Sequence, residues 1–390
     1  MIQSYDLYMP THLIFGKGRI SELKDAVAGA GKKALITYGG GSVKRSGLFP
    51  RVKELLESAG CTVSEFGGIE PNPKITSVRE GVSLCKDEGI DFVVAGGSVL
   101  DASKAICCGA MYPGDPWDLV LDAKKIKAYL PLFDVITLAA TGSEYDRAGV
   151  ISNEETKEKL TIWGNFPVTS ILDPEYTMTV PANQTAAGIA DIMSHTFEQY
   201  IVRDGNMLSD GFCESMLRTV THFGPIAVKD PTNYEARAEI LAASSFGCCG
   251  LLSLGRSPSP WPCHGIEHEV SAWYDITHGV GLAIITPHWM QWCLDTDPAL
   301  VAPKFAQYGV NVFGLNPADG VDVNAAKAIE KTAEFFRSIG ITQTLSDFGI
   351  DDSHFEAMAE HVTTAWVGDY KYAFVPMDKE AVLAVLRASL

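Results

Sequence analysis

Short apolar runs alternate with helical patterns between residues 30 and 140 of this chain. Four of these runs have the length and composition of buried strands: residues 34–38, 61–66, 91–95 and 135–138. Apolar side chains at helical spacing lie between them, for example Leu48, Val52 and Leu55. Strands that alternate with helices predict a parallel sheet with helices on its faces.

The alternation stops at about residue 180. Pro181 opens a long helical pattern, and helical stretches dominate from there to the C-terminus. A chain of 390 residues is also longer than one compact core usually needs. We therefore predict an α/β domain over residues 1–180 and an all-α domain over residues 181–390.

Composition narrows the possible partners and the compartment. The formal net charge is −17, which disfavours nucleic acid and anionic membrane surfaces as partners. The nine cysteines are odd in number and show no pairing framework. The N-terminus lacks the pattern of a signal peptide, and the chain lacks an apolar run of membrane-spanning length. We expect a soluble, cytoplasmic protein.

Two predicted strands end in glycine-rich turns, Gly39-Gly40-Gly41-Ser42 and Gly96-Gly97-Ser98. Glycine lets a backbone approach a phosphate, and the helix N-terminus that follows offers free amides. Neither turn fits G-x-G-x-x-G, and one such turn alone could serve only the geometry of the sheet. Two turns at the carboxyl ends of neighbouring strands favour a dinucleotide. The later segment 139–144 could add hydroxyl and amide donors.

Acidic and imidazole side chains in the helical half have the spacing of metal ligands. Asp191 and His195 lie four residues apart on one helix face, as do His264 and His268, and His278 begins the next apolar segment. Three imidazoles and one carboxylate are an ordinary set for Zn²⁺ or Fe²⁺. A helical Asp–His pair alone often forms only a hydrogen bond.

Taken together, these motifs resemble the iron-containing (group III) alcohol dehydrogenases, most closely their NADPH-dependent butanol dehydrogenase branch. The resemblance runs along nearly the whole chain, and its most specific parts are residues 190–195 and 264–287. Other matching stretches are residues 15–18, 38–44, 70–73, 96–101, 140–144 and 172–174. Two departures are Ala95, where the family usually has a third glycine, and the proline-rich segment 257–263.

The resemblance implies a Rossmann-like dinucleotide-binding domain and an all-α metal domain, the dehydroquinate synthase-like fold, in a homodimer. It implies one divalent metal, Fe²⁺ or Zn²⁺, on Asp191, His195, His264 and His278. It places the pyrophosphate on Gly96, Gly97 and Ser98, with further contacts on Thr141 and Lys159. The full set that we expect to bind NADP(H) is Gly39, Gly40, Gly41, Ser42, Lys44, Gly96, Gly97, Ser98, Asp101, Thr137, Thr141, Ser143 and Lys159.

The expected activity is hydride transfer between NADP(H) and a small primary alcohol or aldehyde, such as butanol or butanal. NADP(H) is favoured because no carboxylate, which would repel a 2′-phosphate, occurs over residues 38–45. His268 is the candidate proton relay, with a supporting hydrogen bond as its alternative role. Two alternative hypotheses keep this fold: a glycerol or polyol dehydrogenase, and a dehydroquinate synthase-like lyase. Two others are a metallohydrolase and a non-catalytic cofactor-binding protein.

Overall fold

A computed structural model describes residues 2–96, 99–364 and 370–390 and divides the chain into two compact units. The α/β unit comprises Tyr8–Val180 and Pro231–Ser245. The helical unit comprises Pro181–Asp230, Phe246–Leu390 and the segment that ends at Leu7. These units differ from the predicted division at residue 180 in two places. The segment that ends at Leu7 belongs to the helical unit, and Pro231–Ser245 belongs to the α/β unit. A division by sequence position cannot show such exchanges, because they depend on tertiary packing.

The α/β unit is built on a six-stranded sheet in which every neighbouring pair is parallel, in the order β1-β8-β5-β4-β2-β3. Its strands are β1 (His12–Phe15), β2 (Lys33–Tyr38), β3 (Thr62–Phe66), β4 (Phe92–Gly96), β5 (Leu132–Ile136) and β8 (Thr169–Leu172). All residues of β4 and β5 are buried, as expected of strands covered on both faces. The predicted parallel sheet is confirmed.

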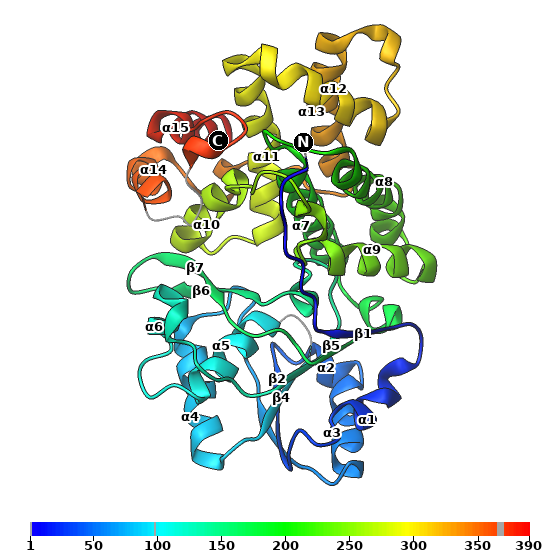
Figure 1. The fold of residues 1–390 in the computed structure, drawn as a ribbon, viewed down its shortest axis with the longest axis vertical. Coiled ribbons are helices and arrows are strands. Elements are labelled where there is room, and N and C mark those ends of the chain that lie inside the picture. The colour runs from blue at the N-terminus through cyan, green and yellow to red at the C-terminus, as the bar shows by residue number, and fades with distance from the viewer. Residues whose placement is uncertain (1, 97–98, 365–369) are drawn as a thin grey trace. The chain divides into compact units, whose positions relative to one another are not determined.

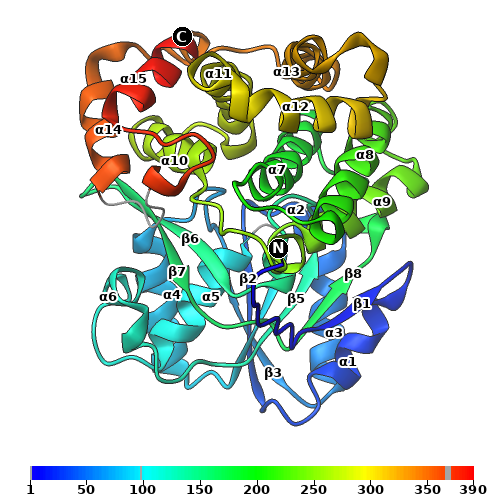
Figure 2. The ribbon, with the colours of Figure 1, turned by 45° about the horizontal axis from the view of Figure 1, so that its top comes forward.

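Helices cover the two faces of this sheet, with α4 and α5 on one side and α1 and α3 on the other (Figures 1 and 2). The helices of this unit are α1 (Leu23–Ala26), α2 (Ser42–Arg45), α3 (Leu48–Ser58), α4 (Ile75–Glu88), α5 (Leu100–Ala110), α6 (Trp117–Leu121) and α9 (Tyr234–Phe246). Leu55 and Leu56 of α3 pack in one cluster with Ile36 and Val94 of the sheet. An antiparallel hairpin of β6 (Ala148–Asn153) and β7 (Glu158–Trp163) completes the unit.

The order of the strands reverses between β2 and β4. The chain passes from β2 to its neighbour β3 on one side, and then crosses to β4 on the other side of β2. Parallel α/β sheets bind ligands beyond the carboxyl ends of the strands at such a switch point. The glycine turns that begin at Gly39 and Gly96 follow these two strands.

The helical unit is arranged around α7 (Ala182–Tyr200), which packs against α8, α10 and α11. All its residues from Thr185 to Tyr200 are buried, as expected of a central helix. The other helices of this unit are α8 (Met207–Lys229), α10 (Pro262–Tyr274), α11 (His278–Thr296), α12 (Pro298–Phe313), α13 (Val321–Ser338), α14 (Phe355–Thr364) and α15 (Lys379–Ala388). Among the described helices, none is long and apolar enough to cross a bilayer.

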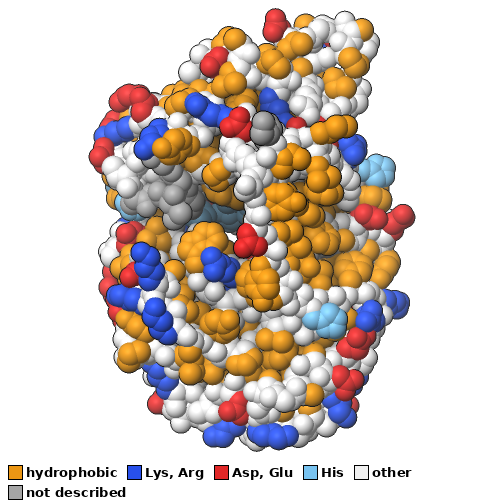
Figure 3. Space-filling view, in the orientation of Figure 1, with side chains coloured by type: hydrophobic (Ala, Val, Ile, Leu, Met, Phe, Trp, Pro, Cys, Tyr) orange, Lys and Arg blue, Asp and Glu red, His pale blue; other side chains and the backbone are white. Residues whose placement is uncertain are grey.

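Most charged side chains lie at the surface, and acidic and basic groups both appear on the face drawn in Figure 3. A minority are buried, and two groups of them stand out. One surrounds Lys104 in the α/β unit, and the other surrounds Asp191 in the helical unit. Buried charges are costly unless they are paired or bind metal, so these groups are the first places to look for chemistry.

Candidate functional site

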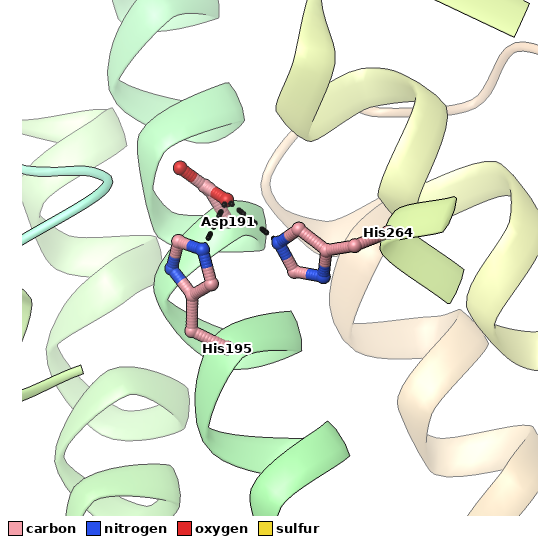
Figure 4. Close-up of side chains that lie close together, drawn as sticks. All are labelled: Asp191, His195 and His264. Atoms are coloured by element: carbon pink, nitrogen blue, oxygen red, sulfur yellow. Dashed lines mark ion pairs between the residues drawn. The ribbon is translucent and has the colours of Figure 1, made fainter. Parts of the chain in front are cut away.

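Three helices of the helical unit bring Asp191, His195, His264 and His278 together. Asp191 and His195 lie on α7, His264 lies in the first turn of α10, and His278 is the first residue of α11. Figure 4 shows the first three converging, with the imidazoles directed at one carboxylate oxygen. Asp191 Oδ1 lies 3.6 Å from His195 Nε2, 3.7 Å from His264 Nε2 and 3.6 Å from His278 Nε2.

These distances fit a metal site. A tetrahedral metal with ligand bonds of about 2.1 Å separates its ligand atoms by about 3.4 Å, close to the spacing found here. Asp191 Oδ1 and His264 Nε2 are buried and have no hydrogen-bond partner within the described part of the chain. Such atoms are costly in a protein interior unless something else binds them. The donor set of one carboxylate and three imidazoles suits Zn²⁺ or Fe²⁺.

Two buried carboxylates orient the imidazoles from behind. His264 Nδ1 donates to Glu198, whose other oxygen accepts from the backbone N–H of Cys263 at 2.8 Å. His278 Nδ1 donates to Glu267, which also accepts from the hydroxyl of Ser271. A hydrogen bond at Nδ1 fixes the tautomer in which Nε2 carries a lone pair. Both imidazoles therefore present a ligand atom toward Asp191.

Glu198 and Glu267 were not predicted from the sequence. Glu198 lies three residues after His195 on the face of α7 that carries Asp191, and Glu267 lies three residues after His264. This spacing was the available signal, but a Glu near a His on a helix more often lies at a surface. Burial separates the two cases, since both Glu side chains are at most 1% exposed.

Glycines at the start of α11 bring His278 close to α7. A Cβ on Gly279 would lie 1.9 Å from the carbonyl oxygen of Ala187, so only glycine allows this approach. A Cβ on Gly281 would lie 2.8 Å from Cγ of Glu267. The Thr277-His278-Gly279 motif thus has a packing role besides its ligand, because it brings helices from distant parts of the sequence into contact.

The electrostatics of the cluster favour a positive charge beside Asp191. Burial raises the pKa of Asp191, but the imidazoles of His195, His278 and His264 more than reverse this, and the net pKa lies well below its usual value. Burial lowers the pKa of His195 to about 4, so this ring is neutral at neutral pH. Burial also disfavours the charge on His264, but Glu198 and Asp191 raise its pKa to about 9. A positive charge is therefore favoured where His264 faces Asp191.

His268 and Trp261 lie beside the cluster. The His268 ring is 3% exposed and its centroid lies 5.3 Å from that of His278. Trp261, within the proline-rich segment, lies in the left-handed backbone region with φ 55°, and the centroid of its ring lies 5.2 Å from that of His264. A non-glycine residue in this region is uncommon and typical of constrained functional loops. The proline-rich segment thus packs its Trp261 ring against the imidazole of His264.

In the α/β unit, the predicted cofactor residues follow the strands at the switch point. Gly39, Gly40 and Gly41 form the turn after β2, while Ser42 and Lys44 belong to α2. Gly96 ends β4, and Gly97 and Ser98 lie outside the described residues. Thr137 follows β5, which is parallel to β4, so it lies at the same edge of the sheet. Lys159 lies on β7, where it is buried.

Asp101 and Ser143 are bonded to each other. Ser143 Oγ donates to Asp101 Oδ1 at 2.7 Å and accepts from Lys104 Nζ at 2.8 Å. The other oxygen of Asp101 accepts from the backbone N–H of Val150 at 2.9 Å. Thr141 is exposed, and its hydroxyl accepts from the N–H of Ser143 at 3.2 Å. These bonds hold the turn at Thr141 against α5 and the hairpin, and Thr141 itself faces solvent.

Lys44, predicted to supply charge to a cofactor, already has partners. Its Nζ lies 2.9 Å from Glu65 Oε2 and 4.7 Å from the centroid of the Tyr38 ring. Arg45, the next residue, donates from its guanidinium to the carbonyl oxygen of Gly40 at 3.4 Å. Two neighbouring cations at the glycine turn therefore have different surroundings.

Comparison with known proteins places this geometry in a family. The family model described as "Iron-containing alcohol dehydrogenase" matches residues 10–174, and the model described as "Fe-containing alcohol dehydrogenase family, C-terminal" matches residues 185–390. NADH-dependent butanol dehydrogenase A of Clostridium acetobutylicum is 45% identical over 392 residues, 99% of each chain. NADPH-dependent aldehyde reductase YqhD of Escherichia coli is 37% identical over 365 residues, 92% of each chain.

A solved structure agrees. The crystal structure of NADH-dependent butanol dehydrogenase A from Thermotoga maritima has a TM-score of 0.93 and 32% identity, and the match covers 100% of this chain and 99% of that one. The resemblance inferred from the motifs and the predicted fold class are both confirmed. This chain belongs to the iron-containing alcohol dehydrogenase family and is an alcohol/aldehyde oxidoreductase.

Proposed function

We propose that this enzyme transfers a hydride between NADP(H) and a small primary alcohol or aldehyde of the butanol/butanal kind, with a divalent metal held by Asp191, His195, His264 and His278. The observation that carries the proposal is the convergence of three imidazole Nε2 atoms within 3.7 Å of one buried carboxylate oxygen. A metallohydrolase could share this cluster, but the glycine turns at the switch point favour a dinucleotide enzyme.

When bound, Fe²⁺ or Zn²⁺ supplies a Lewis acid that polarises the substrate oxygen. Asp191 contributes the negative charge of the ligand set, and its low pKa keeps it ionised. Glu198 and Glu267 hold the imidazoles of His264 and His278 in the ligating tautomer. These residues thus offer a negatively charged, oriented donor set to a cation in a buried site at neutral pH.

His268 is proposed to move the proton that hydride transfer requires. It lies one helical turn beyond His264 on α10, and imidazole titrates near neutral pH. In aldehyde reduction the alcohol oxygen gains a proton, which His268 would deliver, and in alcohol oxidation the same ring would accept it. His268 is the neighbouring imidazole that the proposed ligand set leaves for this step.

NADP(H) is proposed as the preferred cofactor because the turn after β2 carries no carboxylate. Of the three relatives described above, two are named for NADH and one for NADPH, so the family name does not decide between them. A Cβ on Gly39 would lie 3.1 Å from the carbonyl oxygen of Ile69, whereas a Cβ on Gly40 would have nothing within 4 Å. Gly40→Asp is therefore the cleaner test, with Gly40→Ala as its matched control.

The function is tested by following NADPH and NADH oxidation with butanal, shorter and longer aldehydes, and dihydroxyacetone. We expect turnover with aldehydes, a higher kcat/KM for NADPH than for NADH, and a loss in Gly40→Asp confined to NADPH. Higher turnover of dihydroxyacetone would favour a polyol dehydrogenase. No oxidation of either cofactor with any carbonyl compound would refute the proposed reaction.

The working state of the protein is proposed to be a cytoplasmic homodimer. The structure shows no disulfide among the cysteines, all of which lie in the described part of the chain, and this suits a reducing compartment. The dimer is implied by the family resemblance alone. Light scattering on the purified protein should give twice the mass of the 390-residue chain, and a monomer mass would contradict it.

A further inference from the structure

Lys44 is held by one carboxylate and two aromatic rings. Its Nζ lies 2.9 Å from Glu65 Oε2, 4.7 Å from the Tyr38 centroid and 4.9 Å from the Phe49 centroid. The Tyr38 hydroxyl donates to the same Glu65 oxygen at 3.2 Å, and the two rings pack edge to face at 5.3 Å. The positive charge of Lys44 is therefore offset by a full negative charge and a favourable ring contact.

This cluster is joined to the glycine turn. The N–H of Gly68 donates to the carbonyl oxygen of Gly39 at 3.2 Å, and the N–H of Ile69 donates to that of Tyr38 at 3.3 Å. A Cβ on Gly67 would lie 2.2 Å from the Tyr38 ring, so the ring is closely packed against this backbone. Glu65 consequently has a fixed place beside the turn, although half of its side chain is exposed.

Arg45, in contrast to Lys44, is not neutralised by a carboxylate of the described residues. Its guanidinium donates to the carbonyl oxygen of Gly40 at 3.4 Å and lies 3.6 Å from where a Cβ of Gly41 would be. Among the described residues, no carboxylate forms an ion pair with it. Arginine also matches the oxygens of a phosphate with two parallel donors, which lysine cannot do.

We propose that Glu65 is a specificity-determining residue that keeps Lys44 from the 2′-phosphate of NADP(H), so that Arg45 is the cation that meets this phosphate. The inference rests on the proposed binding of a nicotinamide dinucleotide at the glycine turn. Glu65 lies on β3, outside the glycine turn, and limits the discrimination between NADP(H) and NAD(H). Removing the charge of Glu65 releases Lys44 and strengthens that discrimination.

The test is direct binding, so it does not depend on turnover. Adenosine 2′,5′-bisphosphate carries the 2′-phosphate and AMP lacks it, and their Kd values are measured by calorimetry on the wild type, Glu65→Gln, Arg45→Met and Lys44→Met. We expect Glu65→Gln to tighten the bisphosphate about fivefold and Arg45→Met to weaken it about tenfold, with AMP changed less than about twofold. Lys44→Met alone should have less effect than Arg45→Met.

Two further variants separate a charge effect from a general one. Glu57→Gln removes the same charge near the far end of α3, and we expect both Kd values to stay unchanged. In the double variant Lys44→Met/Glu65→Gln the fivefold gain should disappear, because the released cation is absent. All these side chains are substantially exposed, and thermal unfolding checks that each variant is folded.

Three results would overturn the inference. Equal changes for AMP and the bisphosphate in Glu65→Gln would mean that Glu65 shapes the turn and does not act through charge. A Glu65→Gln gain that survives in the double variant would exclude Lys44 as its route, and an unaffected Arg45→Met would exclude Arg45. If the wild type binds neither NADPH nor NADH, the proposed function fails and this inference fails with it. If it binds both and Glu65→Gln leaves the ratio of the two Kd values unchanged, the inference alone is overturned.

Discussion

Each unit of the molecule buries a group of charged side chains, but the two groups are balanced in different ways. In the α/β unit the fully buried Lys104 donates to Asp146 at 2.8 Å, to Ser143 at 2.8 Å and to the carbonyl oxygen of Ala148 at 2.6 Å. In the helical unit no described Lys or Arg forms an ion pair with Asp191, whose neighbours are imidazoles.

A structural network differs from a ligand site in that protein atoms of the chain satisfy its buried charges. Lys104 supplies a permanent cation, and burial raises the pKa of the nearby Glu144 to about 7 although Ser245 donates to it, so this network carries less negative charge than its carboxyl groups imply. Around Asp191, three imidazole Nε2 atoms and one carboxylate oxygen converge, and no Lys or Arg of the described residues pairs with them. A buried group that its own protein atoms do not satisfy is a candidate for binding something else.

The strongest test of this difference is removal of one imidazole. His264→Ala should abolish both metal binding and turnover, because it deletes a ligand and leaves Glu198 buried without its partner. Metal content measured by mass spectrometry and NADPH oxidation with butanal check this. The matched control is His222→Ala, an exposed histidine of α8, which should keep both. An active, metal-loaded His264→Ala would contradict the proposed ligand set.

Lys104→Met should have the opposite effect, costing stability rather than metal. It leaves the charge of Asp146 buried without its cation, and breaking a buried ion pair in this way costs about 3–5 kcal/mol of unfolding free energy. Urea unfolding measures the loss. The double variant Lys104→Met/Asp146→Asn should recover much of it, because the uncompensated charge is gone. A Lys104→Met protein that is stable but metal-free would contradict the distinction between the structural network around Lys104 and the ligand site around Asp191.

His268→Ala should separate metal binding from proton transfer. We expect kcat to fall about 100-fold, a typical contribution of a general acid, while one metal per chain is retained. The titration of an imidazole should also disappear from the pH profile of kcat. If metal is lost together with the rate, His268 supports the ligand set, and if the rate is unchanged it has no part in the mechanism.

Glu198→Gln should have a milder effect on the same cluster. The amide keeps the size of the side chain but weakens the hydrogen bond that orients His264, and loss of such a partner typically costs 10- to 100-fold in metal affinity. A chelator competition series against the wild type measures it. An unchanged affinity would show that packing alone, without the carboxylate, orients the imidazole.

The sequence predicts the architecture well where burial is uniform and less well where it is not. The apolar run at 91–95 falls on β4 to within a residue, whereas β5 was predicted at 135–138 and lies at Leu132–Ile136. The buried Asp134 interrupts the apolar run in the middle of β5 and hides its first half. Burial raises the pKa of Asp134 well above its usual value, which makes an acid tolerable inside a sheet.

The short strands β1 and β8 and the β6–β7 hairpin were not predicted either. β1 and β8 have only four residues each, and β7 begins with Glu158 and Lys159, which do not look like a strand in sequence. Their pairing is decided by distant partners such as the register of Phe15 with Leu172. Local patterns do not carry that information.

The histidine cluster was predictable in part. Helical spacing places Asp191 beside His195, but the approach of α10 and α11 depends on packing between helices, for which Gly279 is needed. The resemblance to a known family supplied that assignment, which stays a prediction, while the structure brings the four side chains together. The partner of Lys44 was not foreseen, because Glu65 lies on β3, beyond helix α3 in sequence, and only the fold brings it to Lys44.

The most direct test of the central claim is anomalous diffraction from a crystal of the protein loaded with Fe²⁺ or Zn²⁺, recorded at the absorption edge of that metal. The account predicts one peak per chain, within about 2.3 Å of Asp191 and of Nε2 of His195, His264 and His278. A peak at other residues, or none in a crystal of active protein, would contradict it.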